Sequence, residues 1–86
     1  MTDEDKRNRR QERRRKVRIA SIIVSEVLPP IPCVILDISL SGARLHVHDH
    51  AEIPDRFTLV QSADKQLHSC TVVWRNENEM GVRFET

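Results

Sequence analysis

Eighty-six residues are enough for one small domain and too few for two independent hydrophobic cores. Hydrophobic residues make up 38% of the chain and aromatic residues 3%, so any core is small and mostly aliphatic. No apolar run approaches the roughly 20 residues of a membrane-spanning helix, and the charged N-terminus lacks the apolar segment of a secretory signal. These features argue against an integral membrane protein and against secretion, and we expect a cytoplasmic protein.

The net charge of +1 conceals an uneven distribution of charged side chains along the chain. Residues 1–18 carry nine basic and four acidic side chains, a net charge of +5. Residues 19–86 carry five basic and nine acidic side chains, a net charge of −4. A basic segment joined to a mildly acidic body is typical of a protein that meets an anionic partner through its basic part.

The basic segment itself lacks the means to fold alone. Between residues 1 and 16 the only apolar side chain is Met1, so no apolar surface is available to offset the entropy of ordering. We therefore expect a flexible basic N-terminal arm over residues 1–12, followed by one folded domain over residues 13–86.

From Val17 onward the pattern changes to short runs rich in β-branched residues, separated by residues that favour turns. Pro29, Pro30 and Pro32 cannot donate to a strand ladder, so they are expected to separate the first two strands. The predicted strands cover residues 19–27, 33–38, 43–49, 56–61, 67–75 and 80–85. Six strands at about ten-residue spacing without a long amphipathic helix predict an all-β protein, a small six-stranded antiparallel β-barrel.

The third predicted strand shows the clearest alternation. Residues 43–49 (ARLHVHD) place apolar and polar side chains at alternate positions, which is typical of a strand with one face on a core. We expect one face to carry Ala43, Leu45 and Val47 and the other to carry Arg44, His46 and His48.

Two short motifs stand where the predicted elements begin and turn. Arg14 and Arg18 form an R-x-x-x-R at the junction of the arm and the first strand. Asp37, Ser39 and Gly42 form a D-x-S-x-x-G at the tight turn between the second and third strands. Either motif alone is common in proteins, so the order and the separation of the two carry the signal.

These motifs, with the strand ends 72–75 (VVWR) and 81–84 (GVRF), resemble the PilZ domain family over about residues 13–86. The resemblance implies a six-stranded antiparallel barrel that acts as a receptor for the bacterial second messenger cyclic di-GMP. It also implies a set of ligand-binding residues, namely Arg13, Arg14, Arg18, Asp37, Ser39 and Gly42. No cofactor other than this ligand is expected.

The chemistry of these side chains agrees with that ligand, which carries two phosphodiesters and two guanines. An arginine can hydrogen-bond to guanine O6 and N7, bind a phosphate or stack on a base. Asp37 can accept hydrogen bonds from guanine N1–H and N2–H₂, which favours guanine over adenine. The Ser39 hydroxyl suits a phosphate oxygen or a base edge, and Gly42 removes a Cβ where positive φ or close ligand approach is needed.

Each of these residues also has a purely structural interpretation. Asp37, Ser39 and Gly42 could stabilise a turn, and the arginine run could be a solvated tail or a non-specific clamp on nucleic acid. We favour the ligand role for Arg14 and Arg18 and the solvated tail for the arginines that precede residue 13. Trp74 is interpreted as a core residue, because the chain has few other aromatics with which to fill a core.

Other chemistry is not supported. His46, His48, His50 and His68 do not provide the three or four converging ligands that zinc needs, and no metal site is expected. Cys33 and Cys70 stand 37 positions apart and are interpreted as small buried hydrophobes, not as nucleophiles. No catalytic triad, paired carboxylates or phosphate-binding glycine loop is found, so we do not expect an enzyme.

Three functions compete at this point. The first is a cyclic di-GMP receptor that signals in trans to a downstream protein, as a monomer or a weak dimer. The second is a PilZ-like adaptor that binds protein without nucleotide, although it would have no use for both motifs. The third is a small nucleic-acid-binding barrel, which the net charge of −4 on the body and the shortage of aromatics make the weakest.

Overall fold

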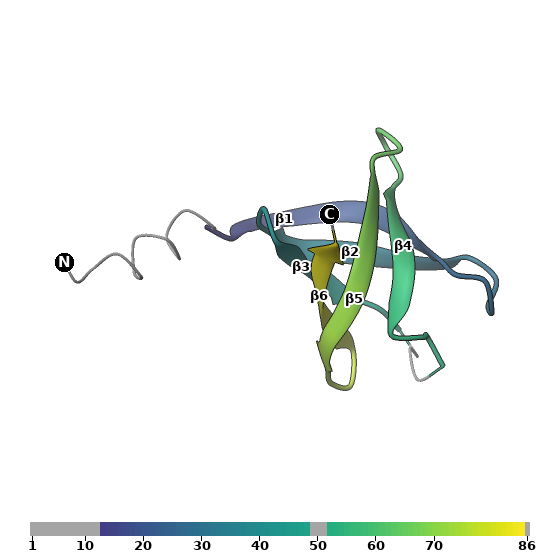
Figure 1. Cartoon of the computed structure of the whole chain (residues 1–86). Coiled ribbons are helices and arrows are strands. Elements are labelled where there is room, and N and C mark those ends of the chain that lie inside the picture. Colours follow the sequence, from purple (N-terminus) through teal and green to yellow (C-terminus); the bar gives the residue numbers. More distant parts are fainter. Residues whose placement is uncertain (1–12, 49–51, 86) are drawn as a thin grey trace.

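The computed structural model describes residues 13–48 and 52–85, and the regular elements found there are all strands. In chain order they are β1 (Arg15–Val24), β2 (Ile31–Ile38), β3 (Gly42–His46), β4 (Arg56–Gln61), β5 (Leu67–Arg75) and β6 (Glu79–Glu85), as drawn in Figure 1. The all-β prediction and the six strands are therefore confirmed. The predicted arm, residues 1–12, lies outside the described residues, and the prediction for it stays a prediction.

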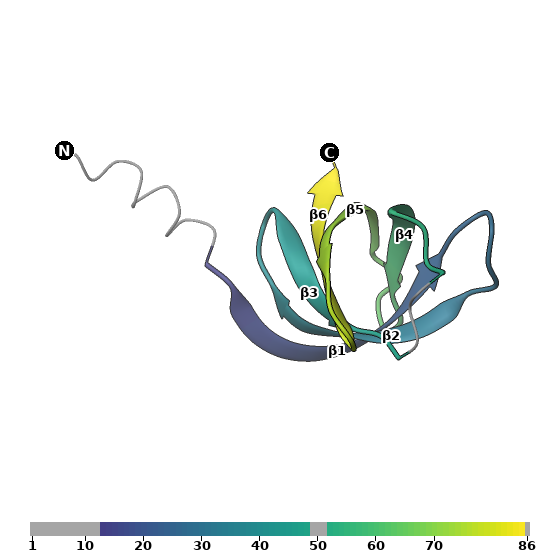
Figure 2. The ribbon, with the colours of Figure 1, turned by 90° about the horizontal axis from the view of Figure 1, so that it is seen from below.

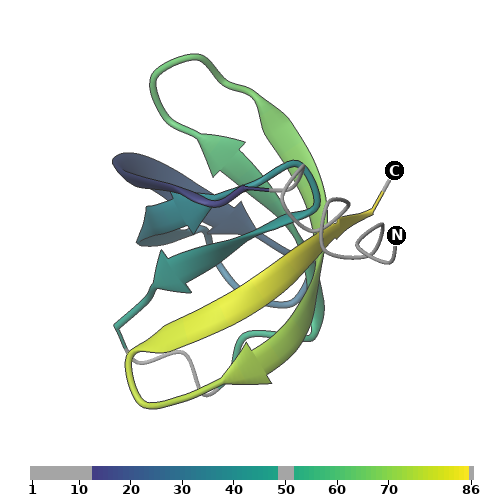
Figure 3. The same ribbon diagram turned by 90° about the vertical axis from the view of Figure 1, so that its left-hand side faces the viewer.

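The strands pair only with antiparallel neighbours and close into a barrel in the order β1-β2-β3-β6-β5-β4. The first strand is long and curved (Figure 2), and its pairing with β4, the last strand in this order, closes the barrel. It pairs with β2 over most of its length, while residues 21–24 also pair with β4. Figure 3 shows the strands arranged around the enclosed space, so the predicted six-stranded barrel is confirmed.

The start of β2 departs from the prediction, because Pro32 lies inside the strand. Pro32 pairs with Ile22 of β1, but the pairing of β2 with β3 begins only at Val34. Pro32 therefore has a strand neighbour on one side only, an edge position at which proline is tolerated in a strand. The first strand also begins earlier than predicted, at Arg15.

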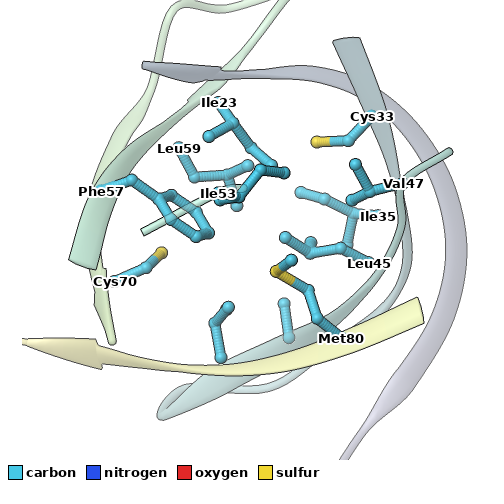
Figure 4. Close-up of a cluster of buried hydrophobic side chains, with 12 residues drawn as sticks. Ile23, Cys33, Ile35, Leu45, Val47, Ile53, Phe57, Leu59, Cys70 and Met80 are labelled. Carbon is cyan, nitrogen blue, oxygen red and sulfur yellow. The ribbon is translucent and has the colours of Figure 1, made fainter. Parts of the chain in front are cut away.

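The barrel interior is filled by a single, mostly aliphatic core to which Phe57 adds an aromatic ring (Figure 4). The predicted alternation in residues 43–49 is confirmed as far as it is described, because Ala43, Leu45 and Val47 are buried while His46 and His48 are exposed. The buried apolar residues are Ile23, Cys33, Ile35, Ala43, Leu45, Val47, Ile53, Phe57, Leu59, Cys70, Met80 and Val82.

Both cysteines lie in this core as free thiols, as predicted. Burial raises the pKa of Cys33 to about 12, and burial is also the largest cause that raises the pKa of Cys70 to about 12. Both thiols therefore stay protonated at neutral pH and lack the thiolate that nucleophilic attack or metal binding requires.

Three shifts of strand register interrupt the regular alternation of side chains. They lie between Lys16 and Ile19 in the pairing of β1 with β2, between Ile35 and Asp37 in the pairing of β2 with β3, and between Val72 and Trp74 in the pairing of β5 with β6. Each shift is a β-bulge or similar irregularity that changes which face the following residue joins.

No helix that could cross a bilayer occurs in residues 13–48 and 52–85.

Candidate functional site

A buried carboxylate near the end of β2 is shared by two arginines. Arg14 Nη1 donates a hydrogen bond to Asp37 Oδ1 at 2.9 Å, and Arg44 Nε donates to Asp37 Oδ2 at 2.8 Å. Arg14 directly precedes β1, and Arg44 lies within β3. Three successive segments of the barrel thus converge on the carboxylate of Asp37.

The bulge in β2 determines which way Asp37 points. Cys33 and Ile35 are core residues, and strict alternation would turn Asp37 to the core as well. The register shift instead pairs Asp37 with Arg44, while Ile35 pairs with the buried Leu45. Paired residues of antiparallel strands share a face, so Asp37 and Arg44 lie on the outer face of the barrel. The burial of Asp37 accompanies its two arginine contacts on that face.

The ion-paired cluster continues from Arg44 to the start of β6. Arg44 Nη1 donates to Glu79 Oε1 at 2.9 Å, so this guanidinium bridges two carboxylates. Hydrogen bonds to Asp37 and to Glu79 raise the pKa of Arg44 above its already high ordinary value. The outer face therefore carries a chain of alternating charges, Arg14, Asp37, Arg44 and Glu79, which we call the ion-pair chain.

The turn between β2 and β3 is held by the other two motif residues. The Ser39 N–H donates to the Gly42 carbonyl at 2.8 Å, and the Ser39 hydroxyl accepts from the Ser41 N–H at 3.3 Å. Gly42 does not have positive φ. A Cβ at Gly42 would collide with the carbonyl oxygen of Val82 on β6. The glycine is therefore required by the close approach of β6, and a ligand role for Ser39 or Gly42 stays a prediction.

The remaining predicted residues, Arg13 and Arg18, are both exposed. Arg18 lies in the register shift of β1, between Lys16 and Ile19. Within the described part of the chain neither arginine forms an ion pair. The structure thus joins Arg14 to Asp37. It leaves Arg13 and Arg18, which are close to Arg14 in the chain, exposed to solvent.

A groove of about 740 Å³ adjoins the motif turn at the end of the barrel where β1 begins. Two rings in its wall, those of His68 and Phe84, stack with centroids 4.3 Å apart. Burial lowers the pKa of His68, so its imidazole is neutral at neutral pH. The groove offers cationic, apolar and hydroxyl groups, among them Arg13, Arg15, Ser39 and Leu40, and its lining also includes the carboxylates of Asp64 and Glu85.

The structure corrects the interpretation of Trp74 as a core residue. Trp74 is 41% exposed, because the bulge in β5 pairs it with Gly81 and turns it to the outer face. A Cβ at Gly81 would collide with the indole, so the ring lies directly over this glycine. Gly81 in turn pairs with Arg44 on β3. The single tryptophan of the protein is therefore close to the ion-pair chain.

The histidine-rich segment does not gather into a site in the part of the chain that can be described. His46 and His48 are exposed, and His50 lies outside the described residues. No group of three or more histidine, cysteine, aspartate or glutamate side chains is placed to hold a metal ion in residues 13–48 and 52–85.

Two members of the ion-pair chain, Arg44 and Glu79, were not singled out as site residues from the sequence. The alternation of residues 43–49 places Arg44 on the polar face but does not indicate a partner. Glu79 is 35 positions further along the chain than Arg44. The pairing of β3 with β6 places Glu79 opposite His46, which is two positions from Arg44 on the same strand. No local pattern signals such a contact.

The geometry combines exposed guanidinium groups with a carboxylate acceptor, which suits a ligand that carries both anionic oxygens and N–H donors. Comparison with known families agrees: the PilZ domain profile matches residues 8–86. No curated protein matches the chain. PilZ domains are generally cyclic di-GMP-binding domains and are not known as a family of enzymes. With the profile covering nearly the whole chain, the resemblance noted from the motifs is confirmed, and the chain belongs to the PilZ domain family.

Proposed function

We propose that this protein is a cyclic di-GMP receptor that binds the dinucleotide through both motifs and passes the signal to a partner protein. The observation that carries the proposal is the contact between the motifs. Arg14 and Asp37 are 23 positions apart, yet their side chains meet at 2.9 Å on the outer face of the barrel. The ligand itself is the only small molecule that this binding requires.

The contact between Arg14 and Asp37 is suited to exchange. Arg14 has a side chain that is 56% exposed, and the buried carboxylate of Asp37 keeps its contact with Arg44 when Arg14 turns away. When the ligand arrives, Arg14 turns to a phosphate or to a guanine, and Asp37 accepts hydrogen bonds from guanine N–H groups. Arg18 and Arg13 add further cationic contacts from the same segment.

The direct test is calorimetric titration of the protein with cyclic di-GMP, with cyclic di-AMP and GTP as controls. We expect saturable binding of cyclic di-GMP and clearly weaker binding of the other two. Because Trp74 stands beside Gly81, the strand partner of Arg44, its fluorescence should change during the same titration. Equal affinity for all three nucleotides would indicate a generic anion site, and no binding of cyclic di-GMP would favour an adaptor without nucleotide.

The two motif arginines should contribute to binding and not to folding. We expect Arg14→Ala or Arg18→Ala to weaken binding of cyclic di-GMP by about 1–3 kcal/mol, roughly 5- to 150-fold, since each loses a charge-assisted contact. The melting temperature of the free protein should change little, because the exposed Arg18 forms no ion pair among the described residues and because the buried Asp37 keeps Arg44 as a partner when Arg14 is removed.

The matched control is Arg56→Ala, which removes an exposed arginine from β4, a strand that does not neighbour β2 or β3. It should leave the affinity unchanged. A large loss of stability with unaltered affinity in Arg14→Ala or Arg18→Ala would assign these arginines to the structure instead.

A further inference from the structure

The two arginines that share Asp37 are held very differently. Arg14 precedes β1, is 56% exposed, and has one ion-pair partner among the described residues, Asp37. Arg44 lies inside β3, which is flanked by β2 and β6, and its side chain is 31% exposed. It is anchored at both ends, through Nε on Asp37 and through Nη1 on Glu79. Arg44 is therefore the fixed partner of the carboxylate and Arg14 the exchangeable one.

The division of the two carboxylate oxygens follows the same pattern. Oδ2 of Asp37 is taken by the anchored Arg44, and Oδ1 by the more exposed side chain of Arg14. If Arg14 leaves, Oδ1 becomes free while the contact at Oδ2 still restrains the carboxylate. An acceptor held in one orientation discriminates between donor patterns better than one that rotates.

We propose that Arg44 is a positioning residue for guanine recognition: held by Glu79, it orients Asp37 so that Oδ1 faces the ligand. This inference rests on the proposed function and adds two residues, Arg44 and Glu79, that lie outside both motifs. Arg44 acts through Asp37 and does not itself bind the dinucleotide.

A direct contact between Arg44 and a ligand phosphate is the rival explanation, and Glu79 separates the two. If Arg44 bound phosphate, Glu79→Gln would free a cation and remove a nearby negative charge, so binding would become tighter. If Arg44 positions Asp37, the same substitution loosens the anchor, and binding becomes weaker. The two explanations therefore predict opposite signs for one isosteric substitution.

The experiment is a calorimetric titration of Arg44→Gln, Arg44→Lys and Glu79→Gln with cyclic di-GMP and with cyclic di-AMP. We expect Arg44→Gln to bind cyclic di-GMP roughly 5- to 20-fold more weakly and to lose part of its preference over cyclic di-AMP. Arg44→Lys keeps the charge but lacks the planar fork that spans two carboxylates, so it should not restore the preference. Glu79→Gln should weaken binding about two- to fivefold. Arg56→Gln, with the same charge change on β4, is the control and should bind like the wild type.

The possible outcomes separate this inference from the proposed function. Weaker binding with reduced nucleotide preference in both Arg44→Gln and Glu79→Gln supports the positioning role. Tighter binding by Glu79→Gln, or full recovery by Arg44→Lys, overturns it while the receptor function stands. If Arg44→Gln fails to fold, the sign of the effect of Glu79→Gln decides. If the wild type binds neither cyclic dinucleotide, the proposed function fails and this inference fails with it.

Discussion

Asp37→Ala should weaken binding of cyclic di-GMP by about 1.5–3 kcal/mol, roughly 10- to 150-fold, because a charge-assisted acceptor for guanine is lost. The same substitution removes a negative charge from a site that receives two phosphates on the proposed function, and it releases Arg14 and Arg44 from their shared partner. Relief of repulsion across a solvated gap is worth on the order of 1 kcal/mol or less. The loss of the acceptor should therefore dominate, and discrimination against cyclic di-AMP should fall as well.

The sign of this change is informative because the two effects oppose each other. A site that attracts only phosphate would bind more tightly after Asp37→Ala, since two arginines would then face the ligand without a competing carboxylate. Asp37→Asn is the companion variant, because it keeps the shape of the side chain and one acceptor oxygen while losing the charge. Melting curves of both variants establish that the barrel is intact. Tighter binding by a folded Asp37→Ala protein would contradict the guanine-reading role.

Gly42→Ala should destabilise the barrel by about 2–3 kcal/mol, which corresponds to a melting temperature lower by roughly 8–24 °C. The added Cβ would overlap the carbonyl oxygen of Val82, a backbone atom of the paired strand β6. Backbone atoms cannot rotate away, so β3 and β6 must separate locally. Because this pairing is needed to close the barrel, thermal and urea unfolding should both report the loss.

Gly81→Ala is the natural comparison, since its Cβ would meet the indole of Trp74 and no backbone atom among its nearest contacts. The indole is 41% exposed and can swing toward solvent, so the loss of stability should be clearly smaller than for Gly42→Ala. The tryptophan emission should change, because the indole can no longer pack directly over residue 81. If Gly81→Ala destabilised the protein as much as Gly42→Ala, the distinction between backbone and side-chain obstruction would be wrong.

The sequence by itself determined the architecture and the family. Short β-branched runs between turn residues predicted six strands, because a strand is a local pattern that alternation and turn chemistry reveal. The alternation of residues 43–49 predicted the burial of Ala43, Leu45 and Val47, and all three are buried. The two motifs resemble those of the PilZ family, to which the chain belongs. The strands and their alternation depend on residues close together in the chain, and the family depends on the order and the separation of the two motifs.

Only the tertiary structure decided which side chains meet on the outer face. Alternation predicts a face by counting residues, and each bulge adds one residue to the count, so Asp37 and Trp74 turn to the outer face where regular alternation would turn them to the core. The contacts of Arg44 with Asp37 and Glu79 span 7 and 35 positions. Such contacts follow from how β2, β3 and β6 pair in the closed barrel, and pairing between distant strands is not encoded in any local pattern of residues.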